Sequence, residues 1–160
     1  MDKHERWNER YAKKELTWSS GPNALLESLV AERPAGKALD IATGEGRNAL
    51  WLASRGWGVD AIDFSSVGIE KGKSMAAERN LEVNWITADV CQRVFARAEY
   101  DLVAVVFLHT TTVGGRSSQD TPTNYVSGNE VQDIHALSGC AAYRFPETRH
   151  VLERGCPHDH

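Results

Sequence analysis

The sequence lacks any apolar run long enough to cross a membrane. Its longest apolar stretch is Leu102–Leu108, whereas a membrane-spanning helix needs about 20 apolar residues. The first eleven residues, MDKHERWNERY, carry too many charges for a secretory signal. We therefore expect a cytoplasmic protein with no membrane contact.

Positive charge is also scarce. The chain has 18 Lys and Arg against 22 Asp and Glu, a formal net charge of −4, and no basic run. Proteins that bind nucleic acid or an anionic membrane surface usually carry a basic patch. We therefore expect no nucleic-acid partner.

Cysteine is rare as well. Cys91, Cys140 and Cys156 are odd in number and far apart, which argues against a disulfide framework and favours free thiols. The His and Cys residues of the last 26 positions match no zinc-ligand spacing, so we expect no metal site. These residues are His135, Cys140, His150, Cys156, His158 and His160.

What the sequence does contain is an alternation of apolar runs and helix-like segments. The strand-like runs are 37–42, 57–62, 81–87 and 100–108, and the helix-like segments are 4–12, 22–33, 47–55, 65–79 and 91–98. Such alternation predicts an α/β fold, a Rossmann-like doubly wound parallel sheet. Gly68 and Gly72 each weaken their helix by about 1 kcal/mol relative to Ala, so we expect tertiary packing to hold that helix.

The pattern ends near His109. Residues 113–160 contain neither Lys nor Trp, and the stretch TTTVGGRSSQDTPTNYVSGNE has the composition of a loop. We place no strand there and expect a folded domain at 1–109 followed by a poorly structured tail at 110–160. The sheet is then incomplete after its fourth strand, which leaves 100–108 near an unprotected edge.

The stretch LDIATGEGRNALWLA, residues 39–53, runs from a strand through closely spaced glycines into a helix. Gly44, Gly46 and Ala49 fit a dinucleotide-binding fingerprint, and Asp63 follows Gly44 by 19 residues, near the spacing of a ribose-binding acid. Asp40, however, is an anion close to where a pyrophosphate would lie. A carboxylate there suits a cationic ligand better.

Residues 40–46, DIATGEG, resemble the first motif of the class I S-adenosylmethionine-dependent methyltransferases, with Ala42 in place of the first glycine. The longer string DIATGEGRNALWLASRGWGVDAIDFS is most similar to the branch that includes tellurite-resistance and thiopurine methyltransferases. The resemblance covers about residues 7–109 and fails after about Thr110. Members of this family complete a seven-stranded sheet, so the resemblance implies a truncated or impaired form that methylates a small molecule.

The resemblance also implies a role for individual residues toward S-adenosylmethionine. Gly44 and Gly46 would let the backbone approach its methionine part, and Asp40 would help to hold its ammonium group. Around the adenosine, Asp63 would accept both ribose hydroxyls, Asp89 the adenine amino group and Phe64 would pack nearby, while the Val90 N–H would serve a ring nitrogen. The aromatic residues Trp7, Tyr11 and Trp18 resemble a segment that covers the cofactor.

Several of these residues have a structural alternative. Asp63 can be a helix N-terminal acid and Asp89 a capping residue, while Phe64 and the three N-terminal aromatic residues can be packing anchors. His109, just past the fourth strand, is a candidate base or substrate contact, or an exposed strand-end residue.

The sequence assigns no catalytic residue beyond His109. Methyl transfer depends mainly on alignment of the reacting groups, so it needs no catalytic triad. Two other functions stay open: a fragment of an NAD-type oxidoreductase, and a non-enzymatic interaction module.

Overall fold

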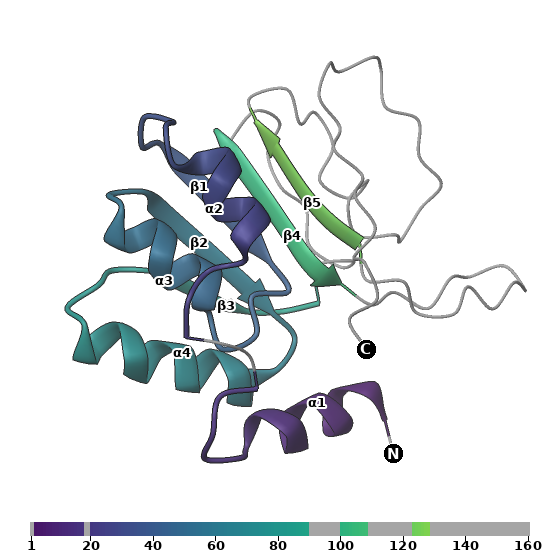
Figure 1. Ribbon diagram of the computed structural model, residues 1–160. Coiled ribbons are helices and arrows are strands. Elements are labelled where there is room, and N and C mark those ends of the chain that lie inside the picture. Colours follow the sequence, from purple (N-terminus) through teal and green to yellow (C-terminus); the bar gives the residue numbers. More distant parts are fainter. Residues whose placement is uncertain (1, 18–19, 90–99, 109–122, 129–160) are drawn as a thin grey trace, which may run out of the picture.

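A computed structural model describes residues 2–17, 20–89, 100–108 and 123–128. The strands form one sheet in the order β3-β2-β1-β4-β5 (Figure 1). The strands are β1 (Lys37–Ile41), β2 (Gly58–Asp63), β3 (Asn84–Thr87), β4 (Leu102–Leu108) and β5 (Thr123–Gly128), and the helices are α1 (Lys3–Tyr11), α2 (Ala24–Val30), α3 (Arg47–Ser54) and α4 (Ser66–Glu78). The first four strands are parallel, which confirms the predicted Rossmann-like α/β fold.

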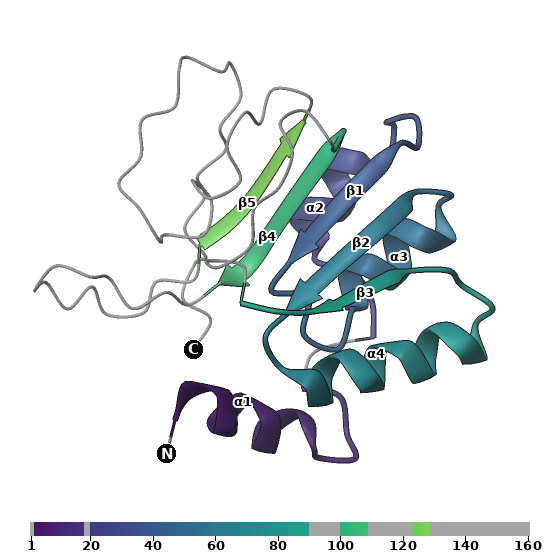
Figure 2. The same ribbon diagram turned by 180° about the vertical axis from the view of Figure 1, so that it is seen from behind.

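Apolar side chains are buried on both faces of the sheet. On one face Ala38 of β1 packs with residues of α2 and α3 such as Leu26 and Leu52, and Figures 1 and 2 show both helices on that face. On the other face Leu39 and Ile41 form a second buried cluster. A parallel strand buried on both faces is expected to be apolar without alternation, which explains the run that identified β1.

Two helices end in the same type of turn. After α3 the N–H groups of Gly56 and Trp57 donate to the carbonyl oxygens of Ala53 and Leu52, at 3.0 and 3.1 Å. This is a Schellman turn, and its left-handed residue, Gly56, has φ 85°. The predicted stop at Gly56 is therefore confirmed. Asn80, with φ 52°, plays the same part after α4.

Gly68 and Gly72 bring α4 against the loop after β1 and against Trp85 of β3. A Cβ atom at Gly68 would lie 2.9 Å from the carbonyl oxygen of Gly44, and one at Gly72 would lie 2.6 Å from the Trp85 ring. These distances are too short for a side chain, so both glycines are required for close packing. This packing explains why α4 tolerates residues that weaken a helix.

The prediction that the fourth strand forms an open edge is wrong. β5 pairs antiparallel with β4, with Leu102 opposite Gly128 and Val105 opposite Tyr125. Residues 123–128 form a strand although their composition is typical of a loop, because they pair with the apolar strand β4. The predicted helix 91–98 lies outside the described residues, as do most of residues 110–160.

Other boundaries shift by a few residues. The third strand begins at Asn84 instead of residue 81, and the second helix covers Ala24–Val30 instead of 22–33. Among the described helices, none combines the length and apolar character that a membrane crossing requires.

We predict that Gly68→Ala destabilises the protein by about 1–3 kcal/mol, because the new methyl group meets backbone that cannot rotate away. Helix propensity acts in the opposite direction by about 1 kcal/mol. Urea unfolding measures the change. Gly21→Ala is the control, because a Cβ there meets nothing within 4 Å; equal stability of the two variants would refute the close packing.

Candidate functional site

The loop between β1 and α3 is a left-handed turn at the carboxyl end of β1. Gly44 and Gly46 have φ 58° and 84°, and Ala42 has φ 56°. A left-handed conformation costs a residue with a Cβ roughly 1–2 kcal/mol. Ala42 adopts this conformation at the position where the methyltransferases that the sequence resembles have their first glycine. The left-handed turn is therefore retained although alanine disfavours it.

Asp63 joins this turn to the end of β2. Its Oδ2 accepts a hydrogen bond from the Gly44 N–H at 2.9 Å, and its Oδ1 accepts one from the Ser65 N–H at 2.8 Å. The side chain is 6% exposed. The carboxylate therefore fixes two adjacent turns relative to each other, and it also lies just before Ser65, the N-cap of α4.

Asp40 lies deeper in the same region and is 1% exposed. The Thr43 hydroxyl donates to its Oδ2 at 2.6 Å. Burial, together with the nearby negative charge of Asp63, raises the pKa of Asp40 to about 7, although the Thr43 hydrogen bond and the positive charge of Arg47 oppose the rise. Asp40 therefore takes up or loses a proton near neutral pH, and a nearby cation would favour its charged form.

The sequence analysis missed two polar residues of α3. Arg47 is the first residue of this helix, and burial lowers its pKa while the charge of Asp40 raises it. Asn48 is 5% exposed, and its Oδ1 accepts a hydrogen bond from the Asn23 N–H at 2.8 Å. Both follow directly after Gly46, a position that could have drawn attention to them.

Helix α1 lies beyond the carboxyl ends of the parallel strands (Figure 1). Trp7 and Tyr11 stack with their ring centroids 5.5 Å apart. The Tyr11 hydroxyl lies 2.6 Å from the point where a Cβ of Gly44 would stand. Tyr11 is thus a wall of the site as well as a packing residue, whereas Trp18 lies outside the described residues.

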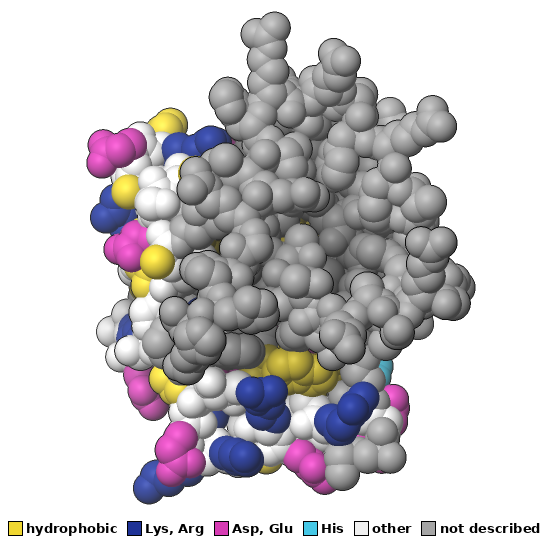
Figure 3. Space-filling model, turned by 45° about the vertical axis from the view of Figure 1, so that its right-hand side comes forward, with side chains coloured by type: hydrophobic (Ala, Val, Ile, Leu, Met, Phe, Trp, Pro, Cys, Tyr) yellow, Lys and Arg dark blue, Asp and Glu magenta, His cyan; other side chains and the backbone are white. Residues whose placement is uncertain are grey.

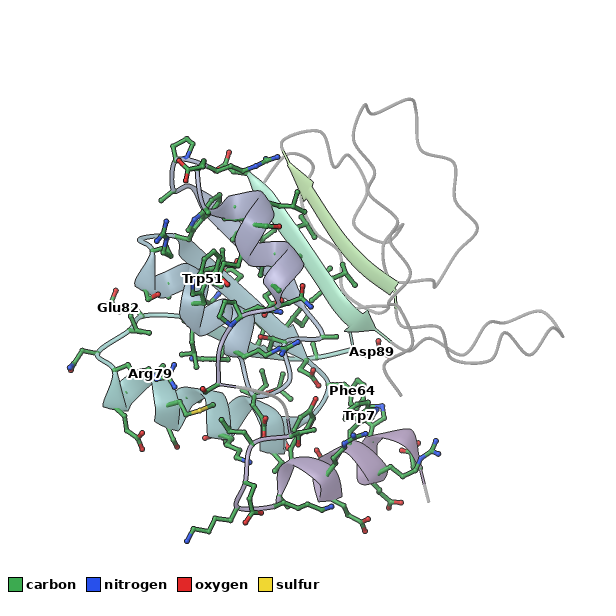
Figure 4. The ribbon with its side chains drawn as sticks, in the orientation of Figure 1. Trp7, Trp51, Phe64, Arg79, Glu82 and Asp89 are labelled. Carbon is green, nitrogen blue, oxygen red and sulfur yellow. The ribbon has the colours of Figure 1, made fainter. Side chains whose placement is uncertain are left out.

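Phe64 and Asp89 lie at the same end of the sheet as Trp7 (Figure 4). Phe64 is half-buried, and its ring centroid is 4.5 Å from that of His4. The Ala88 N–H donates to the carbonyl oxygen of Asp63 at 3.0 Å, which brings the half-buried Asp89 close to the end of β2. Val90 and His109 lie outside the described residues.

The surface around α1 combines apolar and basic side chains. Figure 3 shows hydrophobic side chains beside both Lys or Arg and Asp or Glu in the lower part of the molecule, where Figure 1 places α1. The Arg10 guanidinium, for example, lies 5.2 Å from the centre of the Trp7 ring. The outer surface of the site thus carries charges of both signs, whereas Asp40 and Asp63 are buried in its interior.

The fold agrees with comparisons to known proteins. The chain belongs to the methyltransferase domain family, whose model matches residues 38–117. The matched segment runs from β1 past β4 and includes the glycine turn, Asp40, Asp63 and Asp89. S-adenosylmethionine is the cofactor of this class.

Individual relatives match this chain over only part of their own length. Demethylmenaquinone methyltransferase from Thermus thermophilus is 32% identical over 81 residues, which are 49% of this chain and 37% of that protein. A structure from work on the conversion of a disulfide bond into a thioacetal group during echinomycin biosynthesis has a TM-score of 0.56 and 26% identity, and the match covers 64% of this chain and 46% of that one. This chain thus spans less than half the length of both relatives.

TehB from Haemophilus influenzae is also similar, with a TM-score of 0.47 and 19% identity over 64% of this chain and 33% of that one. This match is too weak to support an argument, so the tellurite-resistance branch stays a prediction.

We predict that the burial of Asp40 makes the protein less stable as pH rises. The folded pKa of about 7 lies above the ordinary value of 3.8, so between these values the folded state holds a proton that the unfolded state has lost. The contribution of Asp40 to stability is therefore fully present below about pH 4 and is lost as pH rises through about 7, by roughly 2–3 kcal/mol between pH 5 and 8.

Urea unfolding of the wild type and of Asp40→Asn at pH 5 and pH 8 measures this effect. We expect the stability of Asp40→Asn to fall less between pH 5 and pH 8 than that of the wild type. Glu78→Gln, a change at an exposed residue of α4, should show the same fall in stability as the wild type. Parallel behaviour of Asp40→Asn and the wild type would contradict the assignment.

Proposed function

We propose that this chain is the cofactor-binding part of an S-adenosylmethionine-dependent methyltransferase that acts on a small molecule. The observation that carries the proposal is the buried Asp63 carboxylate, which links the glycine turn after β1 to the turn after β2. The family match over the same segment supports it. The matched relative is named for a small acceptor, demethylmenaquinone, which supports the substrate class.

The chemistry of the described residues fits this cofactor. The positive φ of Gly44 and Gly46 leaves backbone without side chains at the start of α3, where a ligand can approach closely. Each Asp63 oxygen already accepts one backbone N–H, and a carboxylate oxygen can accept a second hydrogen bond. We propose Asp63 as the acceptor of the ribose hydroxyls.

Asp40 would act on the ammonium group of the cofactor through its charge. Its oxygens already accept hydrogen bonds from the Thr43 hydroxyl and the Ala49 backbone, and its burial keeps water from screening that charge. Asp89 and Val90 would serve the adenine ring, and Phe64 would pack beside it.

Bound S-adenosylmethionine would supply a methyl group on a positively charged sulfur. The chain then has to hold the cofactor in one orientation and exclude water, because alignment accounts for most of the rate enhancement in such a displacement. Tyr11 and Trp7 close the side that faces α1. We propose that His109 contacts the methyl acceptor or acts as its base. We also propose that the acceptor is of the kind used by the tellurite-resistance and thiopurine branch.

Calorimetry with S-adenosylhomocysteine and with NAD tests the proposal. We expect heat with S-adenosylhomocysteine and none with NAD. Asp63→Asn should weaken the binding by about tenfold or more, since it removes charge-assisted hydrogen bonds. The affinity should also increase from pH 6 to pH 8, because Asp40 loses its proton in this range.

Asp60→Asn is the matched control. Asp60 lies on the same strand, away from its carboxyl end, and accepts a hydrogen bond from the Tyr100 hydroxyl at 2.6 Å. It should bind like the wild type. Heat with NAD alone, or equal affinities of Asp63→Asn and Asp60→Asn, would overturn the proposal.

A further inference from the structure

Lys71 of α4 binds the segment that follows α1. Its ammonium group donates to the carbonyl oxygens of Lys13 and Glu15, both at 2.8 Å, and lies 3.4 Å from that of Tyr11. The last carbonyl groups of a helix have no partner within the helix. Lys71 therefore satisfies the end of α1 and the loop behind it with a charged donor.

Glu45 completes this arrangement from the glycine turn. Its Oε1 accepts from Lys71 at 2.8 Å, and its two oxygens lie 3.1 and 2.9 Å from the Thr17 N–H. The side chain is 4% exposed, against 21% for that of Lys71. A carboxylate buried to this extent needs its charged partner, because the loss of one member leaves an uncompensated buried charge.

We call residues 3–17 the N-terminal cover, because they rest on the turns after β1 and β2. Tyr11 packs against both Gly44 and Gly68. The Ser65 hydroxyl donates to Oδ1 of Asn8 at 2.6 Å, and His4 packs on Phe64. Figures 1 and 2 show α1 beyond the carboxyl ends of β1 and β2 in both views.

Glu45 therefore has two tasks in one residue. Its backbone is part of the turn between Gly44 and Gly46, and its side chain holds the N-terminal cover. A ligand seated on this turn lies under the cover, so the cover has to move before the ligand enters or leaves.

We propose that the Lys71–Glu45 ion pair is a latch that holds the N-terminal cover closed and sets the rate of cofactor exchange. This inference rests on the proposed function, because it takes the ligand on the glycine turn to be S-adenosylmethionine or its product. Lys71 and Glu45 are positioning residues in this scheme, and neither touches the reacting atoms.

A latch has a kinetic signature that a ligand contact lacks. Opening the cover is required for both entry and exit, so a weaker latch raises the association and dissociation rate constants by the same factor. The dissociation constant then changes little as long as the closed form still predominates. A lost ligand contact would instead raise mainly the dissociation rate constant.

The test is stopped-flow binding of S-adenosylhomocysteine to the wild type, Lys71→Met, Lys71→Arg and Lys73→Met. We expect Lys71→Met to raise both rate constants about tenfold, the scale of one lost charge-assisted hydrogen bond. Lys71→Arg should restore most of the wild-type rates. Lys73→Met is the matched control, since Lys73 pairs at the surface of the same helix with the exposed Glu70.

Hydrogen exchange of the Thr17 amide in the ligand-free protein gives a second readout, because this N–H donates to Glu45. It should exchange faster in Lys71→Met and at the wild-type rate in Lys73→Met. Unchanged rate constants together with an unchanged Thr17 amide would overturn the latch, as would a rise in the dissociation rate constant alone. If the wild type binds no S-adenosylhomocysteine, the proposed function fails, and the Thr17 amide then decides whether the ion pair holds the cover.

Discussion

The structure depends on one carboxylate, that of Asp63, which accepts the N–H groups of Gly44 and Ser65. These two groups begin the segments that lead into α3 and α4. Each lies at the carboxyl end of a parallel strand, where ligands bind in open α/β sheets. A single buried side chain thereby aligns the ends of β1 and β2.

The same region accepts several costs to stability. Ala42 has a left-handed backbone, Asp40 is buried with a raised pKa, and Gly68 is a weak helix residue. Strain and buried charge persist where the surrounding structure enforces them, and they are typical of ligand sites. Close packing of α4 on the turn, with Tyr11 above it, supplies that enforcement.

The sequence predicted the parts of the site that depend on short segments. β1 is an apolar run, the turn contains Gly44 and Gly46, and Asp63 ends the next apolar run, so the sequence alone predicts which end of the sheet carries the candidate site. The Lys71–Glu45 ion pair was not, because its residues are 26 positions apart and both look like ordinary surface charges. β5 was missed because its pairing with β4 outweighs a composition that resembles a loop.

A titration of nitrogen-15 labelled protein with S-adenosylhomocysteine, followed by NMR, tests the central claim most directly. The account predicts that the amide signals of Gly44, Gly46 and Ser65 shift together and saturate at one ligand per chain, because Gly44 and Ser65 donate to one carboxylate and Gly46 lies in the same turn as Gly44. Shifts confined to the open groove lined by Val59, Ala77 and Trp85, with the turn amides unchanged, would contradict it.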